Sequence, residues 1–223
     1  MTGAAQPPAP RLVQRALRGS GARAGLALVV LLLLIAVLAP VLAPYDPYDQ
    51  DLSAALTAPG REHWLGADQY GRDMLSRVLH GTRSALFAIL VADGLALLLG
   101  GAMGLLAGFA GGVVDAVVMR LTDVLLAFPY LLLALVIVAA LGPSLVNSLI
   151  AIGIVYAPQY ARVMRGQVLA VRGLDFVQAA TSTGANPARV ALRHVLPNCM
   201  GPVLVLATLQ AGSVVVETAG LSF

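Results

Sequence analysis

The sequence contains no lysine, since each of its 14 basic residues is an arginine. A phosphate-binding loop of the G-x-x-x-x-G-K-[ST] type needs a lysine to reach the nucleotide phosphates, so this chain cannot contain one. Any work driven by nucleotide hydrolysis must therefore be done by another chain. Cysteine is nearly absent too, because Cys199 is the single one. A disulfide within the chain is excluded, and Cys199 is expected to be a small buried apolar residue.

Charged residues are also scarce. They make up 11% of the 223 residues, whereas 59% are hydrophobic and the mean hydropathy is +0.86. Roughly a quarter of the residues of a soluble domain are charged, so this composition is typical of a protein that lies in lipid. The 23 glycines agree with that interpretation, since glycine is more frequent in membrane helices than in soluble ones. We expect an all-α fold, a polytopic helical membrane protein.

Residues 24–43 carry no charge over about 20 residues, enough to cross the bilayer core. The preceding tail, 1–23, has no acidic residue, and its basic residues place it in the cytoplasm: they are Arg11, Arg15, Arg18 and Arg23. A cleaved signal peptide is the alternative, because "VLA" before Pro44 mimics a cleavage site. The apolar run is long for a signal peptide and a proline would follow the cut, so we expect an uncleaved first transmembrane helix.

The remaining chain alternates between apolar and polar segments. Residues 44–83 hold six acidic residues and four arginines, and we expect them to form an external loop. A core domain, 84–223, is expected to cross the membrane at 84–112, 124–141, 144–161 and from about 199 onwards. This places 162–198 in the cytoplasm, and its five arginines against one aspartate agree with the positive-inside rule. Five crossings and an end without a flanking charge predict that a sixth span, in a C-terminal part, is missing.

Glycine and proline predict how the crossings pack. A glycine recurs every fourth residue at Gly100, Gly104, Gly108 and Gly112, the small-xxx-small pattern that lets helix backbones approach closely. Phe128-Pro129 is expected to kink the third crossing, because proline removes a helix hydrogen bond. Gly142-Pro143 is expected to form a tight turn between the third and fourth crossings.

Acidic residues within the crossings are candidate functional residues, because their charge is expensive to bury. Asp93 lies within about two turns of the external end, so snorkelling or pairing with a loop arginine is at least as good an interpretation. Asp123 and Arg120 could pair at i, i+3 as a structural anchor. The three histidines show no ligand spacing, so no metal site is expected. No nucleophile with its base is recognisable, so no catalytic residue is expected either.

Residues 175–198 are polar, basic and compatible with helix, although they lie between two apolar stretches. Asp175 is expected to cap a short helix that Gly184 ends in a left-handed conformation. Asn186 is expected to cap a second helix, with proline at its first position, and Pro197 to end it. The pattern predicts a helix–turn–helix elbow outside the membrane. Its small residues suit insertion into a groove of a partner, but it could equally cap its own bundle.

The elbow resembles the "EAA" loop of ATP-binding-cassette importer permeases, which has E-A-A, a glycine four residues later and then L-P. Here Gln178-Ala179-Ala180 precedes Gly184 and Leu196-Pro197. Three further segments resemble the dipeptide/oligopeptide branch of that superfamily: "HWLGADQYGRDMLSRVLHGTRSAL" (63–86), "MRLTDVLLAFPYLLLAL" (119–135) and "ETAGLSF" (217–223).

The resemblance implies a permease subunit of an ATP-driven importer for peptides or similar small solutes, in the bacterial cytoplasmic (inner) membrane. It implies two ATP-binding-cassette ATPase subunits or domains, a second related permease, an external solute-binding protein and a peptide-like solute as partners, besides membrane lipid and without nucleic acid. The partner ATPases would bind ATP, so the chain itself would be neither an enzyme nor a holder of a cofactor.

In the family the EAA elbow docks into a cleft of the ATPase and transmits its closure to the membrane helices. By resemblance, the ATPase-coupling residues of this chain are Phe176, Val177, Gln178, Ala179, Ala180, Gly184, Asn186, Arg189, His194 and Pro197. Gln178 stands where the family usually has glutamate, which puts one ion pair in doubt but not the docking.

Two other functions stay open. An ion- or proton-coupled secondary transporter would need intramembrane coupling groups, and Asp93 and Glu217 are the acidic residues within the predicted crossings. A membrane-embedded scaffold without transport is the second.

Overall fold

A computed structural model describes residues 19–221 of the chain. They fold into two compact units, one ending at Leu86 and the other beginning at Phe87. Helices form the regular structure of the described residues, apart from an isolated antiparallel bridge between Ala67 and Asp73. The prediction of an all-α protein is therefore confirmed. Three arginines used for the orientation lie outside the described residues: Arg11, Arg15 and Arg18.

The first unit consists of a long apolar helix, a polar loop and the start of a second helix. α2 (Ser20–Leu42) keeps most of its side chains exposed. The loop contains the short 3-10 helix η1 (Leu52–Ala54) and leads into α3 (Met74–Ala88). Asp73 caps α3, because its Oδ2 accepts a hydrogen bond from the backbone N–H of Ser76 at 2.8 Å.

Charged groups and glycines hold the loop in a defined conformation. Gly66 and Gly71 have φ angles of 77° and 73°, and a Cβ on Gly71 would lie 1.7 Å from the carbonyl oxygen of Asp51. Asp68, between the two glycines, accepts a hydrogen bond from the guanidinium of Arg72 at 2.8 Å. That bond holds the pKa of Asp68 down at about 2.

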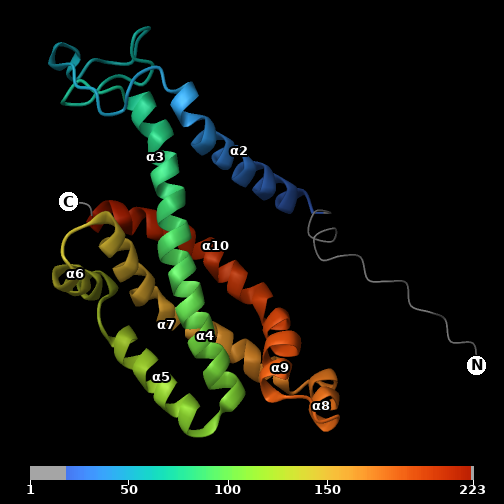
Figure 1. Ribbon diagram of the computed structural model, residues 1–223. Helices are drawn as coiled ribbons and strands as arrows, with labels where there is room; N and C mark the ends of the chain where they lie inside the picture. The colour runs from blue at the N-terminus through green and yellow to red at the C-terminus, as the bar shows by residue number, and fades with distance from the viewer. Residues whose placement is uncertain (1–18, 222–223) are drawn as a thin grey trace, which may run out of the picture. The chain divides into compact units, whose positions relative to one another are not determined.

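The second unit is a helical bundle around one central helix, as Figure 1 shows. In chain order its elements are η2 (Ile89–Asp93), α4 (Gly94–Ala110), α5 (Gly112–Ala127), α6 (Tyr130–Leu141), α7 (Leu145–Arg172), α8 (Asp175–Ser182), α9 (Pro187–Val190), η3 (Ala191–Val195) and α10 (Leu196–Leu221). α7 is the central helix, because η2, α4, α5, α6 and α10 all pack against it. Its buried positions run from Ser148 to Val171.

Three helical stretches within residues 19–221 are long and apolar enough to cross a membrane: Ser20–Leu42, Met74–Ala110 and Pro187–Leu221. α5 and α6 make a fourth if they are counted as one bent span. The chain is thus polytopic, with three or four candidate spans. A count of five also requires α7, which is not among the candidates because polar residues such as Asn147, Gln159 and Arg162 lower its hydropathy. The count of five stays a prediction.

Glycines let α4 lie directly against α7, as the four-residue spacing predicts. A Cβ on Gly100 would lie 2.1 Å from the carbonyl oxygen of Ala157, and one on Gly104 2.4 Å from that of Ala161. A Cβ on Gly108 would lie 2.8 Å from Cβ of Val168. The close packing is therefore confirmed for these three glycines.

The fourth glycine of that pattern is not part of the packing face. α4 ends at Ala110, and Gly111 and Gly112 form the turn into α5 with φ angles of 69° and 54°. No atom lies within 4 Å of a Cβ built on Gly112. The prediction is wrong at this position, because the helical repeat stops before reaching it.

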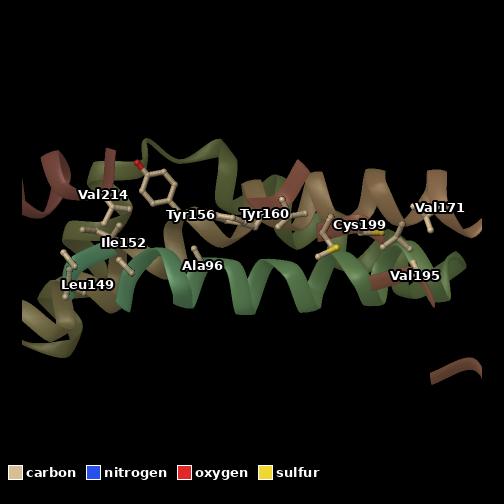
Figure 2. Packing of buried hydrophobic residues seen from close by; sticks show 14 of the residues in the cluster. Ala96, Leu149, Ile152, Tyr156, Tyr160, Val171, Val195, Cys199 and Val214 are labelled. Atoms are coloured by element: carbon tan, nitrogen blue, oxygen red, sulfur yellow. The ribbon is translucent and has the colours of Figure 1, made fainter. Parts of the chain in front are cut away.

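Buried apolar side chains run along the whole length of α7. Figure 2 shows Val171, Val195 and Cys199 at one end of this cluster and Leu149 and Ile152 at the other. Cys199 is fully buried, which confirms the prediction for this residue. The core therefore joins α7 to α10 and η3 as well as to α4.

The proline after Phe128 does more than kink a helix. α5 ends at Ala127, α6 starts at Tyr130, and their axes differ by 97°. Proline has no N–H and clashes with the carbonyl four residues earlier, which explains the break. At the other end of α6, Gly142 has a φ of 91°, and Ser144 caps α7 by accepting a hydrogen bond from the N–H of Asn147 at 3.1 Å. The predicted kink and turn are both confirmed.

Candidate functional site

The elbow, residues 175–198, follows directly on the last turn of α7. α8 and α9 are its two short helices, joined by a tight turn (Figure 1). α8 begins after Gly173-Leu174, where the backbone N–H of Val177 bonds to the carbonyl of Leu174 at 3.0 Å. α8 is thus joined to α7 by a two-residue link.

The turn between α8 and α9 has the geometry that its glycine predicts. The N–H of Gly184 donates to the carbonyl of Thr181 at 3.0 Å, and the N–H of Ala185 donates to that of Ala180 at 3.2 Å. With φ of 77° at Gly184, this is a Schellman motif, which satisfies the last free carbonyls of a helix. The left-handed glycine is confirmed.

The start of the second helix is also confirmed. Asn186 stands at the N-cap of α9, and its Oδ1 accepts a hydrogen bond from the N–H of Ala188 at 2.9 Å. Pro187 occupies the first helical position, where its missing N–H costs nothing. The backbone of the elbow is therefore fixed locally at its turn and at the helix that follows.

The predicted cap of the first helix is wrong. Leu174 occupies the N-cap position of α8, without a side-chain hydrogen bond, and Asp175 is already the first residue of the helix. Asp175 still favours the helix electrostatically, because a negative charge in the first turn faces the positive end of the helix dipole.

Pro197 does not end the second helix, contrary to prediction. Helical structure continues from Pro187 to Leu221, through the π-helical turn η3 just before the proline. A π-turn widens the helix, so the proline ring fits without breaking it. The side-chain amide of Asn198 donates to the carbonyl of His194 at 2.7 Å and satisfies a carbonyl of this widened turn.

Valines attach the elbow to the core. Val177 is 3% exposed, Val190 2% and Val195 fully buried. They belong to the same apolar cluster as Val168 and Val171 of α7. Among the predicted coupling residues, Val177 therefore faces the protein's own core.

The other predicted coupling residues lie at or near the surface. Ala180 and His194 are half-buried. Those that are exposed are Phe176, Gln178, Ala179, Gly184, Asn186, Arg189 and Pro197. Leu174 and Leu192 are also exposed, by 48% and 59%. Leu192 is exposed although Val195, three residues later, is fully buried.

Gln178 makes a local bond that the family's glutamate could not make. Its Nε2 donates to the carbonyl of Gly173 at 3.0 Å, beside the end of α7. An ionised carboxylate only accepts hydrogen bonds. In this chain position 178 therefore helps to hold α8 against the end of α7.

Comparison with known proteins identifies the family. Residues 100–223 match the family described as binding-protein-dependent transport system inner membrane component, and residues 11–59 match the N-terminal transmembrane domain of oligopeptide transport permease C. The chain belongs to this family of inner membrane transport components. The resemblance that the motifs predict is confirmed.

Curated relatives of this inner membrane component carry names of peptide transport systems. The chain is 43% identical over 196 residues to the probable D,D-dipeptide transport system permease of Escherichia coli K12. The match covers 88% of this chain and 66% of the relative. The chain is 43% identical over 209 residues to the di/tripeptide permease of Pseudomonas aeruginosa, covering 91% and 69%. The glutathione permease of Pectobacterium atrosepticum is 38% identical over 196 residues, with 87% and 65% covered.

Two tyrosines of α7 in this membrane component form hydrogen bonds with acidic side chains that lie far from them in the sequence. The hydroxyl of Tyr160 donates to the carboxylate of Asp93, which is 5% exposed and lies in the π-turn η2. The hydroxyl of Tyr156, one turn earlier, donates to Glu217 of α10. Asp93 thus pairs with a buried tyrosine, a partner that none of the alternatives considered for it had included.

The predicted pair of Asp123 with Arg120 is wrong as well. A guanidinium nitrogen of Arg162, on α7, donates to Asp123 at 2.7 Å. The partner lies 39 residues away in the sequence, so no local spacing could reveal it.

Groups of His, Cys, Asp or Glu that could hold a metal ion are absent from residues 19–221.

Proposed function

We propose that this chain is a transmembrane subunit of an ATP-driven importer for peptides or similar small solutes. The elbow is the observation that carries the proposal: a two-helix unit fixed by a Schellman turn and an asparagine cap, with its outer residues exposed. The names of the relatives, which concern dipeptides, tripeptides and glutathione, support this class of solute. The absence of a lysine-bearing phosphate loop assigns ATP hydrolysis to partner subunits.

The coupling residues divide by burial into two roles. The exposed ones, among them Phe176, Gln178 and Ala179, meet the ATPase, and Gly184 keeps the turn narrow enough to enter its cleft. Val177 faces inward and passes the displacement of α8 to α7 through Val168 and Val171. Closure of the ATPases thereby exchanges inward- and outward-open arrangements of the membrane helices, as in alternating access.

The complete importer is proposed to contain two ATPase subunits or domains, this chain, a second related permease and an external solute-binding protein. It lies in the bacterial inner membrane. The N-terminal tail and the elbow face the cytoplasm, whereas the loop between α2 and α3 faces outside.

The function is tested by uptake into proteoliposomes that contain the complex of this chain with its ATPases and permease partner. With the binding protein and labelled dipeptides, tripeptides or glutathione outside, we expect uptake that requires ATP inside. A complex whose ATPases have lost the phosphate-loop lysine is the control and should not transport. Uptake by this chain alone, or uptake driven by an ion gradient without ATP, would contradict the proposal.

The orientation makes a separate prediction. In a Cys199→Ser background, Ser53→Cys in the external loop and Ser182→Cys in α8 place one thiol on each side of the membrane; both serines are exposed. A membrane-impermeant maleimide added to intact spheroplasts should label the first variant and leave the second unlabelled. Permeabilised cells are the control and should label both. Labelling of the Ser182 variant from outside would refute the orientation.

A further inference from the structure

Three arginines of the predicted cytoplasmic segment lie on the last part of the long helix α7. α7 continues beyond the predicted crossing, to Arg172. Arg162, Arg165 and Arg172 follow one another at spacings of three and seven residues, which places them on one side of the helix. All three have partners on α4 or α5.

The strongest of these contacts joins Arg165 to Asp115, in the first turn of α5. Nε and Nη2 of Arg165 donate to the two carboxylate oxygens of Asp115, each at 2.5 Å. Side-chain exposure is 32% for the arginine and 19% for the aspartate. A two-pronged bond between partly buried groups fixes both distance and orientation, which a lysine or a single bond would not do.

Arg172 makes a second contact near the same place. Its Nη1 donates to the carbonyl of Gly108 at 2.8 Å, in the last turn of α4. A positive side chain is stabilising at the C-terminal end of a helix, because the last carbonyls there have no hydrogen-bond partner within the helix. The end of α7 that leads into the elbow is therefore joined to the end of α4 and the start of α5.

Apolar packing does little to hold the start of α5. Val113 and Val117 are 79% and 62% exposed, and Thr122 is the one buried residue of this helix. The charged contact of Asp115 with Arg165 thus supplies a specific attachment that the side-chain packing of α5 does not.

We propose that Arg165 is a positioning residue for the transport cycle, which acts through Asp115 to make the α4–α5 hairpin move together with α7 and the elbow. This proposal rests on the proposed function. In the assembled importer, displacement of α8 moves α7, and the two-pronged ion pair carries the start of α5 along. Without the pair the elbow still moves, but part of its displacement is lost before it reaches α5.

The test uses Asp115→Asn in the assembled complex, with ATP hydrolysis and solute uptake measured side by side. The amide has one acceptor oxygen and no charge, so it cannot replace the two parallel bonds that the carboxylate makes with the guanidinium, and uptake per ATP hydrolysed should fall by about fivefold or more. Hydrolysis itself and the amount of assembled complex should stay within about twofold. A purely structural role would lower the amount of complex and leave the uptake per ATP unchanged.

Asp123→Asn is the matched control. It is the same substitution on the same helix, and it removes the bond between Asp123 and Arg162. The side chains of this pair are exposed, Arg162 by 54% and Asp123 by 52%. Exposed ion pairs contribute little, so uptake per ATP should change by less than about twofold. The exchanged pair Asp115→Arg with Arg165→Asp should restore at least about half of the lost coupling, since attraction between the two positions returns.

Hydrogen exchange separates this proposal from the proposed function. In the purified complex, amides at the start of α5 should exchange faster in Asp115→Asn than in wild type or Asp123→Asn. If wild type shows no ATP-dependent uptake, the proposed function fails while this comparison still decides whether the pair holds α5. Unchanged exchange, unchanged uptake per ATP in Asp115→Asn, or no restoration by the exchanged pair would each overturn the proposal.

Discussion

Gly100→Ala is expected to disrupt the second unit, although it adds a single methyl group. That methyl would lie 2.1 Å from the carbonyl oxygen of Ala157, 2.6 Å from Cβ of Tyr160 and 2.9 Å from the carbonyl carbon of Ala157. Two of these atoms are backbone, so α4 and α7 must move apart. We expect a loss of about 3 kcal/mol or more in the free energy of unfolding, the upper part of the range for overpacking. For a chain of this size the thermal unfolding midpoint should fall by about 6 °C or more.

The neighbouring Gly101→Ala is the control, because it makes the same change on the same helix. Its methyl would meet only the Cε of Met164, at 3.7 Å, which is ordinary contact. The unfolding midpoint of this variant should equal or slightly exceed that of wild type, since alanine has the higher helix propensity. Equal midpoints for the two variants would mean that α4 and α7 do not lie as close as the structure places them.

Local chemistry made the elbow turn and the glycine face predictable from sequence. A Schellman turn needs one residue with positive φ, and an N-cap needs one short polar side chain, so Gly184 and Asn186 could be recognised without the rest of the fold. The contact of Gly100 and Gly104 with a second helix followed from their spacing, but the sequence did not say that this helix is α7.

The partners of the charged residues could not be predicted in this way. Asp93 binds Tyr160, 67 residues away, and Asp115 binds Arg165, 50 residues away. From the sequence, Arg165 contributes only to the predicted orientation in the membrane, because the positive-inside rule considers its charge and not its contacts. The path of α7 past α4 and α5 decides what that charge touches, and no periodicity in the sequence encodes that path.

Pro197 shows the opposite kind of failure, in which a good local rule is overridden. Proline usually ends or kinks a helix because its ring meets the carbonyl four residues earlier. Here the π-turn η3 relieves the contact, and buried Val195 and Cys199 on either side hold the helix in the core. The prediction treated the elbow and the final span as separate, whereas α9 and α10 belong to one helical stretch.

Gly184→Val is expected to uncouple ATP hydrolysis from uptake while leaving the protein in the membrane. The φ of 77° at this position strains any residue with a Cβ, and a β-branched one most. No atom lies within 4 Å of a Cβ built there, so the effect comes from backbone strain in the turn and not from a clash inside the chain. A strain of about 1 kcal/mol or more acts against the Schellman turn that orients α8 toward α9. Uptake per ATP hydrolysed should fall by about fivefold or more, measured in proteoliposomes with the ATPases.

Two further substitutions show whether the turn conformation is the cause. Gly184→Asn should retain most of the uptake, because asparagine tolerates positive φ better than other residues with a side chain. Gly166→Val makes the valine substitution at an exposed position of α7 that also has open space around it but helical backbone, and it should leave coupling unchanged. If the left-handed turn sets the position of α8 in its docking cleft, uptake should be highest in wild type, lower with asparagine at position 184 and lowest with valine. If the asparagine and valine variants transport equally well, the turn does not control the elbow, and the coupling force must reach α7 by another route.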